Sequence, residues 1–140
     1  MSHIVNSETP GKRRTSILKL LANLQPEIDS QNISQEIRND VIAFVILSLT
    51  ELEKTIHETI VPWEKRGYWT KAEQFTAEWN WVSSIKSRML NTETSKGWTD
   101  WPEEIIRLKE HLINIKPTRK KMGSFWMGSY KRYKHQAIKK

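Results

Sequence analysis

Apolar residues recur three and four positions apart along most of the chain, which is the spacing of one face of an α-helix. The pattern is longest from Ile37 to Ile60 and predicts a helix over 34–61. Between 41 and 49 apolar residues cover nearly the whole circumference, as in a central helix packed on several sides. A strand is the competing interpretation of 41–47, but the helical spacing continues on both sides without a turn signal. Pro62 is expected to end this helix, because proline disfavours helical geometry in the residue before it.

The same spacing predicts three further helices, over 16–24, 70–91 and 101–116. Thr70 and Glu73 have the spacing of a capping box, in which each side chain bonds a free backbone N–H at the start of a helix. Pro102 is suited to the first turn of the last helix. The predicted fold is therefore all-α: a single antiparallel helical bundle of about four helices over 15–116, with a flexible basic arm at 1–14 and a basic C-terminal tail at 117–140.

Charge separates the last part of the chain from the rest. Of the 140 residues, 23 are Lys or Arg and 16 are Asp or Glu, and nine of the basic residues with none of the acidic ones lie between Lys116 and Lys140. The preceding residues carry 14 basic and 16 acidic side chains. The net charge of +7 thus originates at one end of the chain, which predicts an anionic partner for that end.

Aromatic side chains are interleaved with the basic ones in this tail. Cations neutralise phosphates, and aromatic faces stack on unpaired bases, so the composition favours single-stranded or irregular RNA, or a ribonucleoprotein surface. The predicted nucleic-acid-binding residues are Arg119, Lys120, Lys121, Phe125, Trp126, Tyr130, Lys131, Arg132, Tyr133 and Lys134. Three alternatives remain open: a solvated tail that binds polyanions nonspecifically, a tail whose Phe125 and Trp126 fold back onto the bundle, and attachment to an anionic membrane surface.

A second set of aromatic residues lies near predicted helix ends, where Trp and Tyr could form hot spots for a protein partner. These residues are Trp63, Tyr68, Trp69, Trp98 and Trp101. They support the alternative function of a protein–protein assembly factor. The competing interpretation is structural, with the rings closing the ends of the bundle.

Catalytic signatures are weak. The chain has no Cys and four His without ligand spacing, so no metal site, cofactor or small-molecule substrate is predicted. Gly123 and Gly128 have the gap of a phosphate loop, but the Lys and Ser or Thr that must follow are absent. The longest apolar run, 41–49, falls short of the roughly 20 residues that cross a bilayer. The sequence therefore predicts a non-enzymatic, cytoplasmic accessory protein.

Overall fold

The computed structural model describes residues 8–118 and 122–139, with side chains up to Gln136. This part of the chain is predominantly helical and has no strand, which confirms the all-α prediction for it. Its helices are α1 (Pro10–Ala22), α2 (Gln25–Asp29), α3 (Gln35–Lys65), α4 (Trp69–Trp79), α5 (Trp81–Asn91), α6 (Glu104–Leu112) and α7 (Ser129–Lys139). The arrangement differs from a simple four-helix bundle, because the helices are more numerous and α7 belongs to the C-terminal segment.

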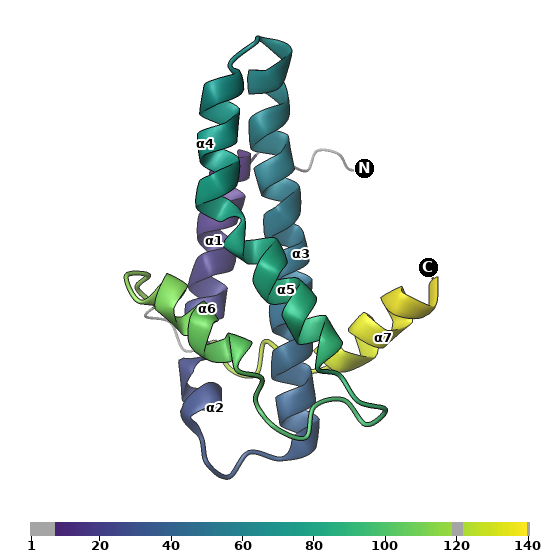
Figure 1. The fold of residues 1–140 in the computed structure, drawn as a ribbon. Helices are drawn as coiled ribbons and strands as arrows, with labels where there is room; N and C mark the ends of the chain where they lie inside the picture. The colour runs from purple at the N-terminus through teal and green to yellow at the C-terminus, as the bar shows by residue number, and fades with distance from the viewer. Residues whose placement is uncertain (1–7, 119–121, 140) are drawn as a thin grey trace.

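The axis of the fold is α3, against which α1, α4, α5 and α7 all pack (Figure 1). Its middle section is buried on nearly every side, from Val41 to Leu49, as the apolar pattern predicts. Ser34 caps its first turn by accepting a hydrogen bond from the Ile37 N–H at 3.2 Å. No helix in the described ranges is long and apolar enough to cross a bilayer.

The N-terminal part of α1 corrects the predicted boundary of the flexible arm. Thr9 accepts a hydrogen bond from the Lys12 N–H and Pro10 occupies the first turn, so the helix begins six residues before the predicted start at Ser16. Arg13 and Arg14 are thereby fixed on a helix that packs against α3. Residues 1–7 of the predicted arm lie outside the described residues.

Two further boundaries differ from the prediction. α3 continues through Pro62 to Lys65, because a proline so close to a helix end removes a single hydrogen bond from the last turns. The predicted helix over 70–91 is two helices, α4 and α5, separated at Asn80. In Figure 1 α4 runs alongside α3 and α5 crosses it, so the interruption changes the direction of the chain. The predicted capping box of Thr70 is absent, since α4 already begins at Trp69.

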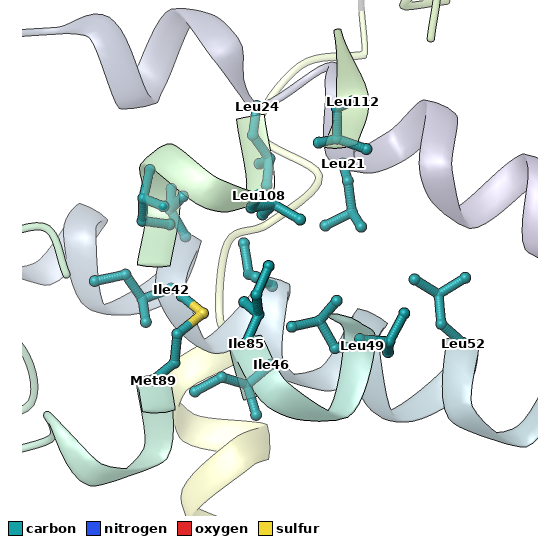
Figure 2. Close-up of a cluster of buried hydrophobic side chains, with 14 of the residues drawn as sticks. Leu21, Leu24, Ile42, Ile46, Leu49, Leu52, Ile85, Met89, Leu108 and Leu112 are labelled. Carbon is teal, nitrogen blue, oxygen red and sulfur yellow. The ribbon is translucent and has the colours of Figure 1, made fainter. Parts of the chain in front are cut away.

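The core lies in the half of the molecule where α1, α5 and α6 meet α3. Figure 2 shows leucines of α1 and α6 in one cluster with the apolar side chains of α3 and α5. The loop before α6 is tied to the same region, because the Asn39 amide accepts from the Trp98 N–H at 2.7 Å and donates to the Lys96 carbonyl at 3.0 Å. This loop places the Trp98 side chain, which is only 1% exposed, beneath the C-terminal segment.

Candidate nucleic-acid interface

The C-terminal segment folds back onto the bundle through its first two rings. Trp126 is 7% exposed, and its indole N–H donates to Glu27 at 2.8 Å. Phe125 packs edge-on against Phe44 of α3, with 5.2 Å between ring centroids. Both rings join the main core cluster. The alternative in which Phe125 and Trp126 fold back is therefore the arrangement that the structure shows.

Two tyrosines continue this packing along α7. The rings of Tyr130 and Tyr133 each lie 5.9 Å from the ring of Trp98, and both hydroxyls donate to the carboxylate of Glu93, at 3.2 and 2.7 Å. Lys134 pairs with the same carboxylate at 2.7 Å. The carboxylate of Glu93 is thus bound by three side chains of α7.

A third carboxylate holds the beginning of α7. The two oxygens of Asp40 accept from the backbone N–H groups of Gly128 and Tyr130, at 3.0 and 2.9 Å. A negative charge beside the first N–H groups of a helix complements its dipole. Because Asp40 belongs to α3, it caps α7 from a distant part of the sequence and sets its register on the bundle.

These contacts shift the pKa values of the groups involved. Burial would raise the pKa of Glu93, but the hydrogen bonds from Lys134 and Tyr133 outweigh burial and hold it below its ordinary value. Burial, together with the bond to Glu93, raises the pKa of Tyr133 well above its usual range. Hydrogen bonding to Glu93 raises the pKa of Lys134. At neutral pH the group is therefore an ionised carboxylate between a protonated lysine and two neutral phenols.

The remaining described cations of α7 point away from this contact. Lys131 and Arg132 are exposed, and neither forms an ion pair within the described residues. Arg132 donates to the Ser129 hydroxyl at 2.9 Å. His135 is exposed one turn further on. The predicted contacts Arg119, Lys120 and Lys121 lie outside the described residues.

The packing corrects the prediction that the four rings of the tail contact nucleic acid. Phe125, Trp126, Tyr130 and Tyr133 all pack against the core cluster, because each ring finds an apolar neighbour on α3 or in the loop before α6. Lys134 is matched by an acid of the same chain. Of the predicted set, Lys131 and Arg132 keep the surface position that phosphate contact requires.

The aromatic residues of the second predicted set differ in how far they are exposed. Trp98 is buried and Trp101 is half-buried with the Arg38 guanidinium 6.0 Å from its ring centroid, so these two close the fold near the loop before α6. The prediction that Trp98 is exposed to a partner is therefore corrected. Tyr68 and Trp69, at the turn between α3 and α4, are 52% and 59% exposed.

Sequence reasoning missed the acidic residues that hold the tail, namely Glu27, Asp40 and Glu93. Each lies in a polar stretch or on the polar side of a helical pattern, where a solvated carboxylate is the ordinary expectation. A signal was nevertheless present: a net charge near zero over the first 115 residues leaves acids that a basic, ring-rich tail can engage. Within the described ranges no three His, Asp or Glu side chains gather as a metal site would require.

Comparison with protein-family models, with curated proteins and with solved structures found no match to this chain. The site must therefore be interpreted from its own geometry.

Proposed function

We propose that this protein is a non-catalytic helical accessory protein that binds RNA, or the RNA of a ribonucleoprotein surface, through the cations of its C-terminal segment. In this proposal the four tail rings anchor the segment, and the cations contact phosphates. The observation that carries it is the docking of the C-terminal segment by its four rings and by three carboxylates, while Lys131 and Arg132 stay exposed.

Docking favours phosphate binding for an entropic reason. A free basic tail must lose the freedom of its backbone and long side chains when it binds, whereas the backbone of α7 is already ordered. The net charge of the chain also supports an anionic partner. Residues 1–115 carry 14 basic and 16 acidic side chains, too small an acidic excess to offset the nine cations of residues 116–140. Contact through phosphates is independent of base sequence, so affinity is expected to depend on salt more than on sequence.

The test is a salt titration of the full chain with mixed-sequence single-stranded RNA. Lys134 pairs with Glu93, so contact of the other five predicted cations with phosphates gives a slope of roughly −3.5 in a plot of log affinity against log salt concentration. Reversing two of them in K131E/R132E should weaken binding and make the slope shallower by about 1.4. The matched control is K12E/K96E, which changes the net charge equally at two exposed lysines outside α7.

Three results would contradict the proposal: no binding at low salt, a slope near zero, or equal losses in the α7 variant and in the control. An equal loss would show that net charge acts without a defined surface. Selective loss in K131E/R132E would place the contact on α7.

A further inference from the structure

The turn between α3 and α4 lies at the end of a helical hairpin, which projects from the rest of the fold in Figure 1. Gly67 has a φ of 81°, the left-handed conformation that ends many helices. The N–H groups of Gly67 and Tyr68 donate to the carbonyls of Glu64 and Trp63, at 3.0 and 2.8 Å, which is the Schellman pattern of helix termination.

Trp63 supports the turn from one side. Its ring packs edge-on against Phe75 of α4 with 5.4 Å between centroids, and the Lys71 ammonium lies 4.4 Å from its centroid. The backbone bonds and this packing fix the two ends of the turn. Tyr68 and Trp69 are therefore presented by an ordered backbone, although each is more than half exposed.

Three cations lie within three residues of the exposed rings in the sequence. Lys65, Arg66 and Lys71 are exposed, and none forms an ion pair within the described residues. The open depression here is lined by Gly67, Tyr68, Trp69, Thr70 and Lys71, without an aliphatic side chain. A protein hot spot usually lies in a well-packed apolar patch, whereas exposed rings among cations are typical of surfaces that bind single-stranded nucleic acid.

We infer that Tyr68 and Trp69 stack on unpaired bases of RNA, and that Lys65, Arg66 and Lys71 contact the adjoining phosphates. This inference rests on the proposed function, because it assigns a second contact to the same partner. In this assignment the bases stack on Tyr68 and Trp69, since the rings of the C-terminal segment already pack against the core cluster. Along α3, the 26 residues from Asp40 to Arg66 span about 39 Å. A strand stacked at roughly 3.4 Å per nucleotide covers that distance with about 12 nucleotides.

The test uses the full chain and a 20-nucleotide mixed-sequence RNA, supplied either single-stranded or as a duplex with its complement. Loss of stacking in Y68A/W69A should weaken binding of the single strand roughly 5- to 150-fold for each base that is stacked. Its salt slope should stay unchanged, because no cation is removed. Duplex binding should be equal in the wild type and the variant, since paired bases are not available to these rings.

The matched control is I113A, which removes a large apolar side chain that is 79% exposed and lies directly after α6. It should bind both RNAs as the wild type does. Circular dichroism verifies that each variant retains its helix content.

The outcomes separate this inference from the proposed function. If the wild type does not bind RNA, both fail. If the wild type binds with the expected salt slope and Y68A/W69A binds equally well, the stacking assignment alone is wrong. Equal losses of single-stranded and duplex binding would also overturn it.

Discussion

Replacing Trp126 with alanine should release α7 from the bundle while leaving the rest of the chain folded. Trp126 is 7% exposed and donates to Glu27 at 2.8 Å, so the substitution removes a buried ring and leaves a carboxylate without its donor. Truncating a buried tryptophan costs about 3–5 kcal/mol. Since every 1.4 kcal/mol is tenfold, the open form of the segment should become roughly 150- to 4,000-fold more populated.

Amide hydrogen exchange measures this opening directly. Exchange of the backbone amides over 130–136 should accelerate by that factor in W126A, while the amides of the buried middle of α3 should exchange much as before. Trypsin supplies a second readout, because Lys131, Arg132 and Lys134 become cleavable once α7 is free. W126F keeps most of the apolar area but loses the bond to Glu27, and it should accelerate exchange only about tenfold.

The control is M127A, because Met127 is 66% exposed on the same segment and should not affect exchange. Unchanged exchange over 130–136 in W126A would refute the reasoning, since the ring would then contribute nothing to docking. Equal acceleration throughout α3 would refute the separate release of α7.

Three further predictions concern the groups that hold the loop and the tail. G97A should lower the free energy of unfolding in urea by about 2–4 kcal/mol, because Gly97 has a φ of 93° and an added Cβ would overlap the Asn39 amide; an unchanged midpoint would contradict this. D40A should remove about 1–2 kcal/mol of helix capping, so hydrogen exchange of the α7 amides should accelerate while exchange of the α6 amides stays unchanged. Docking should also depend on pH. The lowered pKa of Glu93 contributes stability above its unfolded value near 4.3, which is lost as the pH falls through the folded pKa. The raised pKa of Tyr133 contributes stability below its unfolded value near 10, which is lost at higher pH. The fluorescence of Trp126, taken as the difference between wild type and W126F because the chain has seven Trp, should therefore show a plateau between about pH 5 and 9 in a titration from pH 3 to 11, and a change inside that window would contradict both assignments.

The elements of this fold were largely readable from periodicity, because a helix buries one face and its apolar residues repeat accordingly. The buried section of α3, between Val41 and Leu49, is the clearest case. The break at Asn80 was not readable, since no Gly or Pro marks it and the change of direction depends on how α5 packs against α3.

The candidate site was predicted less well than the helices, because the burial of its rings depends on residues that are distant in sequence. Composition identified the cations and rings of the tail, but it cannot tell whether a ring faces solvent or the core. That choice depends on acceptors such as Glu93, which lies some 40 residues away in sequence from the tyrosines it binds. The position of Tyr68 and Trp69 near helix ends left both exposure and burial open, and the structure leaves the two rings more than half exposed.

The way in which α7 is attached affects how this molecule can be shortened. A chain that stopped after Ile115 would leave Phe44 and Trp98 in contact with water. It would also remove the hydrogen-bond donors of Glu27 and Asp40 and the cation that pairs with Glu93. Such a fragment should self-associate or denature readily. A loss of ligand binding by the fragment would then reflect its poor solubility and would not identify the residues that bind the ligand. Point substitutions on the solvent side of α7 are the sounder way to find what the last residues recognise.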